Sequence, residues 1–158
     1  MVNEHDALKI FNSIYTNLNL PQAEAYGINF QSETNGLTEH TLISKGGDVY
    51  ELIDRLKNDG SSLIWDAIAV ITTGWAAPID PANKNKDEDV PPSQHPDRVR
   101  VYLMSIVTPD QKIASILKLD NEEEPSYDTS GTGNLADSLK SIYKKGKTFN
   151  ERSDKFLI

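Results

Sequence analysis

The chain has 158 residues, which is one domain by length and enough to enclose a hydrophobic core. Its formal net charge of −8 argues against binding nucleic acid by direct phosphate contact, because phosphate neutralisation needs clustered Lys and Arg. The absence of cysteine excludes disulfides, thiolate nucleophiles and cysteine metal ligands, and it favours a cytoplasmic location. No apolar run approaches the roughly 20 residues that span a bilayer, and residues 1–6 do not resemble a secretory signal, so we expect no membrane association.

The first part of the chain predicts two helices separated by two strands. Apolar residues at helical spacing predict a helix over residues 7–18. Alternating residues 26–30 predict a half-buried strand, and residues 41–44 predict a shorter one. Asp48 can cap a second helix, which Gly60 would end.

The second part predicts three strands and a final helix. Residues 63–71 are almost continuously apolar, which is typical of a strand covered on both faces. Residues 98–107 and 112–119 are joined by turn-forming residues and predict a hairpin. Thr132 or Asn134 can cap the last helix.

The resulting element order is α-β-β-α-β-β-β-α. This order predicts a single α+β domain over residues 1–146, in which helices pack on a five-stranded antiparallel sheet. Residues 147–158 would form a C-terminal tail.

A long segment, residues 75–97, separates two of the predicted strands. Loops of this length inside a compact domain are commonly functional or disordered. Its polar middle, residues 83–89, should be mobile, whereas its two ends should be ordered. The candidate binding residues lie at these ends: Trp75, Pro78, His95 and Asp97. The segment can be either a solvent-exposed extension of two strands or a binding loop.

Asp66 interrupts the most apolar run of the sequence. A carboxylate in a covered strand must be hydrogen-bonded, be paired, or have a raised pKa. Asp66 is therefore either a structural group or a further candidate binding residue, and an enzyme could combine it with His95 and His40. No nucleophile or phosphate-loop motif is present, and the histidines lack the spacing of metal ligands. We assign no catalytic residue and expect no metal and no cofactor.

Four short motifs between residues 65 and 143 carry a resemblance to known proteins. They are Trp65-Asp66-Ala67-Ile68-Ala69-Val70, Thr73-Gly74, Arg98-Val99-Arg100-Val101, and Gly131-Thr132-Gly133 with Leu135-Ala136-Asp137. This region resembles small uncharacterised proteins of actinobacterial and phage genomes. The element order also resembles roadblock and profilin-like domains, and that resemblance implies pairing or scaffolding.

These observations favour a non-enzymatic interaction protein. It would bind another protein through its exposed loops, and the resemblance suggests a phage-encoded accessory or inhibitor protein. The alternative is a small-molecule or metal-dependent enzyme that uses Asp66, His95 and His40. An exposed sheet edge and the apolar residues 156–158 further predict a homodimer.

Overall fold

Six strands form one antiparallel sheet in the order β2-β1-β3-β4-β5-β6. The computed structural model describes residues 3–16, 23–31, 37–60, 64–77, 91 and 94–143. In chain order the elements are α1 (Glu4–Thr16), β1 (Glu24–Gln31), β2 (Leu37–Lys45), α2 (Val49–Asp59), β3 (Ala67–Ala76), β4 (Val99–Val107), β5 (Ile113–Leu119), β6 (Ser126–Asp128) and a third helix over residues 134–143.

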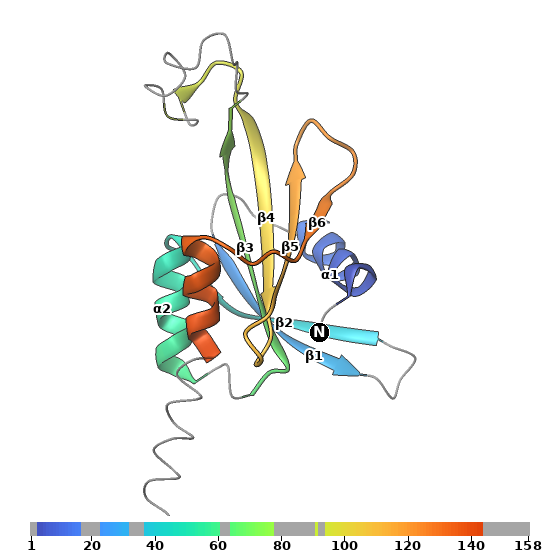
Figure 1. Ribbon diagram of the computed structural model, residues 1–158, viewed down its shortest axis with the longest axis vertical. Coiled ribbons are helices and arrows are strands. Elements are labelled where there is room, and N and C mark those ends of the chain that lie inside the picture. Colours follow the sequence, from blue (N-terminus) through green and yellow to red (C-terminus); the bar gives the residue numbers. More distant parts are fainter. Residues whose placement is uncertain are drawn as a thin grey trace, which may run out of the picture.

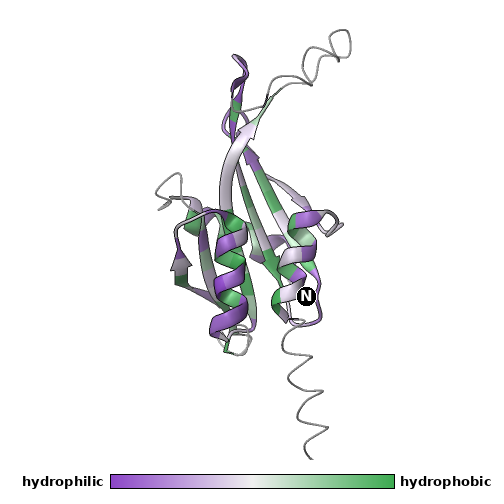
Figure 2. Cartoon of the chain, turned by 90° about the vertical axis from the view of Figure 1, so that its left-hand side faces the viewer, coloured by the Kyte–Doolittle hydropathy of each residue, from purple (hydrophilic) through white to green (hydrophobic). Residues whose placement is uncertain are grey.

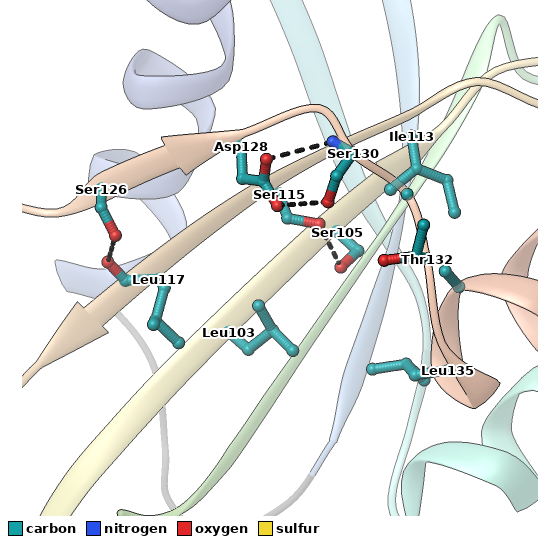
Figure 3. A pocket seen from close by; sticks show the side chains of 12 residues that line it. Leu103, Ser105, Ile113, Ser115, Leu117, Ser126, Asp128, Ser130, Thr132 and Leu135 are labelled. Atoms are coloured by element: carbon teal, nitrogen blue, oxygen red, sulfur yellow. Dashed lines mark hydrogen bonds between the residues drawn. The ribbon is translucent and has the colours of Figure 1, made fainter.

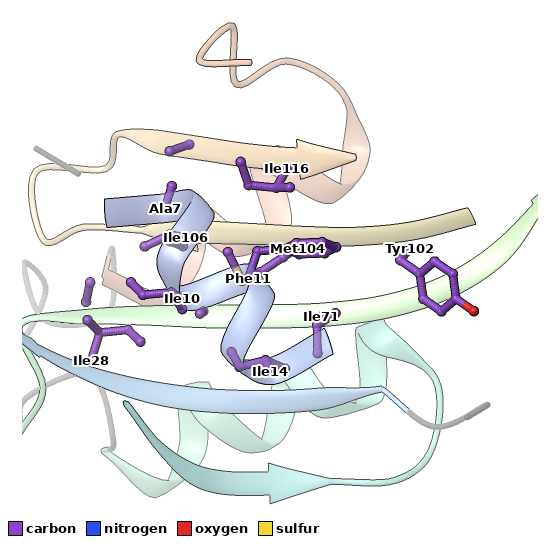
Figure 4. Close-up of a cluster of buried hydrophobic side chains, with 13 residues drawn as sticks. Ala7, Ile10, Phe11, Ile14, Ile28, Ile71, Tyr102, Met104, Ile106 and Ile116 are labelled. Carbon is purple, nitrogen blue, oxygen red and sulfur yellow. The ribbon is translucent and has the colours of Figure 1, made fainter. Parts of the chain in front are cut away.

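The helices cover the two faces of the sheet (Figure 1). Helix α1 places Ile10, Phe11 and Ile14 against one face, where they pack on buried residues of β1, β3, β4 and β5 (Figure 4). Helix α2 and the third helix cover the other face and present mostly hydrophilic residues outward (Figure 2). The core therefore consists of two apolar layers with the sheet between them.

Local chemistry explains where α2 begins and ends. The side chain of Asp48 accepts hydrogen bonds from the backbone N–H groups of Tyr50 and Glu51 at 2.8 and 2.9 Å. Gly60 ends the helix with φ of 75°, a conformation that favours glycine. The sequence predicted both ends correctly.

The predicted α+β class is confirmed, and the sheet has six strands rather than five. The additional strand, β6, has three residues and pairs with β5. The third helix begins after Gly133, whose carbonyl accepts from the N–H of Asp137 at 3.0 Å, so neither Thr132 nor Asn134 is its N-cap. The two predictions on residues 83–89 and 147–158 lie outside the described residues.

Strands β3 and β4 continue beyond the helices as a two-stranded arm (Figure 1). We define the arm as residues 72–76 of β3 and residues 99–101 of β4, of which residues 74–76 pair antiparallel with residues 99–101. All arm residues are partly exposed, whereas residues 67–71 of β3 are buried.

Within the described ranges, no helix is long and apolar enough to cross a membrane.

Candidate functional site

Trp75 and Arg100 of the arm lie on the same face as Arg98, which directly precedes β4. Trp75 lies directly opposite Arg100 in the register of β3 and β4. The Cζ atoms of Arg100 and Arg98 lie 4.2 and 4.8 Å from the centroid of the Trp75 ring. Both distances are in the range of cation–π attraction. We call Trp75, Arg98 and Arg100 the arm patch.

The turn before β4 holds Arg98 in place. The carbonyl of His95 accepts from the backbone N–H and from Nη1 of Arg98, each at 3.2 Å. The Nδ1 atom of His95 accepts from the backbone N–H of Asp97 at 3.0 Å. His95 and Asp97 therefore help to position Arg98 through hydrogen bonds that involve backbone groups of this turn.

An open recess of about 530 Å³ lies beside the arm patch. Arg98, Arg100 and Trp75 form one side of it, and Asp120 and Asn121 from the turn after β5 form another. The N–H of Asp120 donates to the carbonyl of Arg100 at 2.9 Å, which fixes this turn against β4. Within the described residues, neither guanidinium forms an ion pair with a carboxylate.

Tyr102 forms the inner end of the recess, where the helix-covered part of the sheet begins. Its ring packs edge-on against Tyr15 of α1, with 4.9 Å between the ring centroids. Burial and then the negative charge of Asp120 raise the pKa of the Tyr102 phenol. The phenol is therefore neutral at physiological pH, and the positive charge of the recess comes from the two arginines.

The structure brings three of the five predicted binding residues to the same end of the sheet. Trp75, His95 and Asp97 lie at the arm. Pro78 lies outside the described residues. Asp66 precedes the first residue of β3, at the opposite end of a ten-residue strand. At about 3.3 Å per residue, this places Asp66 about 30 Å from the arm patch.

The expectation that Asp66 sits inside a covered strand is wrong. Strand β3 begins at Ala67, and the preceding Ile64 is 73% exposed. The Asp66 carboxylate accepts from the N–H of Phe30 at 2.8 Å, and its own N–H donates to the carbonyl of Ile28 at 2.9 Å. The side chain is exposed and bonds to the backbone of β1, which is the arrangement of a structural group.

The three residues of the enzyme alternative do not meet. His40 lies on β2 and packs against the Tyr26 ring with 5.7 Å between the ring centroids. No hydrogen bond joins His40 to Asp66 among the described residues, because β1 lies between their strands. His95 lies at the arm, beyond the other end of β3.

The part of the chain that the structure describes contains no group of three or more His, Asp or Glu side chains arranged to hold a metal ion.

Comparisons of the chain with family models, with curated proteins and with solved structures each return no match. The geometry of the described residues is therefore the basis for any statement about function.

Sequence reasoning did not select Arg98 and Arg100 as site residues. The signal was present, because the alternation Arg98-Val99-Arg100-Val101 places both arginines on one face of a strand. The sequence does not show the register of β3 and β4, which places Arg100 opposite Trp75.

Proposed function

We propose that the chain is a non-enzymatic binding protein that recognises an acidic segment of a protein partner through the arm patch. The proposal rests on one observation. Two arginine side chains are held over one tryptophan ring at the edge of an open recess, and neither pairs with a described carboxylate.

The chemistry of these residues supports a binding role. Guanidinium groups bind carboxylates through two parallel hydrogen bonds, and stacking on an indole restricts their motion before the partner arrives. Trp and Arg are also enriched among residues that dominate the energy of protein interfaces. The arm carries these groups away from the helices, where a partner can reach them (Figure 1).

The charge of the whole chain favours a protein over a nucleic acid as the partner. The patch contributes two positive charges to a chain whose formal net charge is −8. A nucleic acid requires many phosphate contacts, and its repulsion from the remaining surface would oppose binding. A short segment with two or three carboxylates can use the patch alone.

The test is selection of binding sequences from a random peptide display library on the folded wild-type protein. We expect the enriched peptides to contain Asp or Glu and to bind more weakly as the salt concentration rises. Binding should fall at least tenfold in W75A and in R98Q/R100Q. Removal of the Asp120 charge in D120N should strengthen it, because Asp120 lies beside the recess and repels carboxylates.

Two variants control for charge and for aromatic area. K9Q/K112Q removes the same positive charge from exposed positions on α1 and on the turn between β4 and β5. Y50A removes an aromatic side chain that is 48% exposed on α2. Both should bind as the wild type does. The proposal is wrong if the selected peptides lack acidic residues, or if R98Q/R100Q binds them as well as the wild type does.

The homodimer, the cytoplasmic location and the phage origin stay predictions. The outer strand β2 has two features that oppose pairing with a second copy. Its register with β1 shifts at Tyr26, and Arg55 donates to the carbonyls of Lys45 and Gly46 at 3.2 and 2.7 Å. A dimer would therefore use another surface, and light scattering at high micromolar concentration decides between monomer and dimer.

A further inference from the structure

A second candidate site lies on the face of the sheet opposite the arm patch. Successive residues of a strand point to opposite faces, so Leu103 and Ser105 of β4 lie on the other face from Arg100 and Tyr102. Here strands β4, β5 and β6 and the segment leading into the third helix enclose a groove of about 270 Å³ (Figure 3). We call this space the hydroxyl groove.

The hydroxyl groove contains two serines that together can donate one hydrogen bond to a ligand. Ser105 and Ser115 are directly opposite each other on β4 and β5, and their Oγ atoms lie 3.0 Å apart. Ser105 is only 4% exposed. The two hydroxyls have two protons but share one hydrogen bond, so one O–H remains able to donate to a ligand.

A carboxylate forms the wall beside this pair. Asp128 of β6 accepts from the N–H of Ser130 at 3.1 Å and from its hydroxyl at 2.6 Å. These bonds lower the pKa of Asp128 and hold the carboxylate in one orientation. A carboxylate has about four acceptor positions, so the group can still accept hydrogen bonds from a ligand.

The segment over the groove is fixed by contacts with the third helix. The ammonium of Lys140 donates to the carbonyl of Gly131 at 2.9 Å, and Gln111 donates to the carbonyl of Lys140 at 3.0 Å. Gly131 itself has φ of 58°, which favours glycine. The groove is therefore present before any ligand binds, and binding costs little reorganisation.

The residues that line the groove restrict its ligand. Hydroxyl groups of Ser, the hydroxyl of Thr132 and one carboxylate supply hydrogen bonds, while Leu103, Leu117 and Leu135 supply apolar contact. Among the described residues, no Lys, Arg, His or aromatic side chain lines it. A phosphate would meet no cation in the lining, since the Lys140 ammonium is already bonded to the Gly131 carbonyl, and a nucleobase would find no ring for stacking.

We propose that the hydroxyl groove binds a small neutral polyhydroxy compound, namely a cyclic polyol or a monosaccharide. A pair of adjacent hydroxyls would donate to Asp128, and a third would accept from the Ser105–Ser115 pair. The C–H groups of the ring would contact the leucines. The volume lies near the lower limit of small-molecule sites, about 300 Å³, which suits one ring rather than a chain of rings.

The test is a titration of the isotope-labelled full chain with glucose, myo-inositol and glucose 6-phosphate, followed by backbone amide shifts. We expect saturable shifts at Ser115, Asp128 and Ser130 with at least one neutral probe. S105A/S115A should weaken that binding at least tenfold. This pair of changes removes both hydroxyls together and so leaves no unpaired group in the fold.

A matched control removes a hydroxyl from the other face of the sheet. Ser13 of α1 is exposed there, and S13A should bind the probe as the wild type does. The proposal is wrong if no neutral probe causes saturable shifts, if S105A/S115A keeps wild-type affinity, or if glucose 6-phosphate binds more tightly than glucose. Ethanolamine serves as a cationic probe, and its tighter binding would also overturn the proposal.

Discussion

The two halves of the β3–β4 hairpin share one hydrogen-bond ladder but lie in different surroundings. In the base, residues 67–71 of β3 are buried, and residues 68–71 pair with residues 104–107 of β4. In the arm, residues 72–76 are partly exposed on the same strand. The base lies between helices on both faces, whereas the arm extends past them (Figures 1 and 2).

The sequence of each half follows from this difference in cover. Residues 67–71 of the base are apolar on both faces, because each face packs on a helix. Residues 98–101, which lead into and form the second strand of the arm, alternate Arg and Val, because one face carries the arm patch. Stability should therefore depend on the base, and binding on the arm.

Truncation of a buried side chain in the base should have the largest effect. Met104 is fully buried between α1 and the sheet, so M104A should lower the free energy of unfolding by about 2–5 kcal/mol. V101A truncates a partly exposed residue of the arm and should cost less than about 1 kcal/mol. Urea denaturation measures both. If M104A and V101A lowered the free energy of unfolding equally, the arm would be part of the core.

A pair of glycines extends the comparison to the backbone, since Gly27 of β1 pairs with Ile68 of the base and Gly74 belongs to the arm. A Cβ atom on Gly27 of β1 would lie 2.1 Å from Cδ2 of Trp65, whose ring packs on the strand at this point. On Gly74 of the arm, a Cβ atom would meet Cγ1 of Val101 at 3.6 Å, an ordinary contact. G27A should therefore cost about 1–3 kcal/mol, since the core must shift to accept it.

G74A is the matched control for G27A. It should be neutral or stabilise the fold by up to about 1 kcal/mol, because it reduces the conformational freedom of the unfolded chain. Thermal unfolding of both variants gives the difference. A stable G27A would mean that Trp65 does not pack against β1.

Elements with a strong local pattern were predictable from the sequence. The hairpin of β4 and β5 was predicted over residues 98–107 and 112–119, because both strands are apolar and a turn joins them. Strand β6 was missed, because three polar and partly exposed residues carry no hydrophobic pattern. Its pairing with β5 depends on contacts that only the folded chain makes.

The start of β3 was misplaced for a similar reason. Ile64 and Trp65 extend the apolar run, but the chain there is held by Asp66, which bonds to the backbone of β1. This tertiary contact overrides the local pattern. The hydroxyl groove was beyond prediction, since its serines come from three strands and a loop that are separated in sequence.

Alkaline pH provides a third test, at a buried phenol of the third helix, which packs in the same cluster as Ile68 and Val70 of the base. The hydroxyl of Tyr143 has no hydrogen-bond partner among the described residues. Burial, and secondarily the charge of Asp66, raise the pKa of Tyr143. A raised pKa gives stability that is fully present below the unfolded value of about 10 and is lost as pH rises above it.

Y143F should therefore flatten the fall in unfolding free energy between pH 9 and pH 11. At pH 7 it should change stability by no more than about 1 kcal/mol, because it removes an unpaired hydroxyl. Y50F removes the hydroxyl of a tyrosine that is 48% exposed and is the matched control for Y143F. Identical profiles for Y143F and the wild type would contradict the assigned burial.

The smallest effect on stability is expected at the arm patch. An exposed cation–π contact contributes about 0.5–1 kcal/mol, so W75A should destabilise the fold by about 1 kcal/mol or less. A double-mutant cycle of W75A and R100A should give a coupling free energy of about 0.5 kcal/mol. The cycle of W75A and R98A should give a smaller coupling, because Arg98 lies 4.8 Å from the Trp75 ring and Arg100 lies 4.2 Å from it. Urea denaturation of the single and double variants yields these values. If W75A lowered the free energy of unfolding by more than about 2 kcal/mol, the indole would be part of the core. Substitutions in the arm would then change the stability of the fold as well as the affinity for a partner, and the distinction between arm and base would fail.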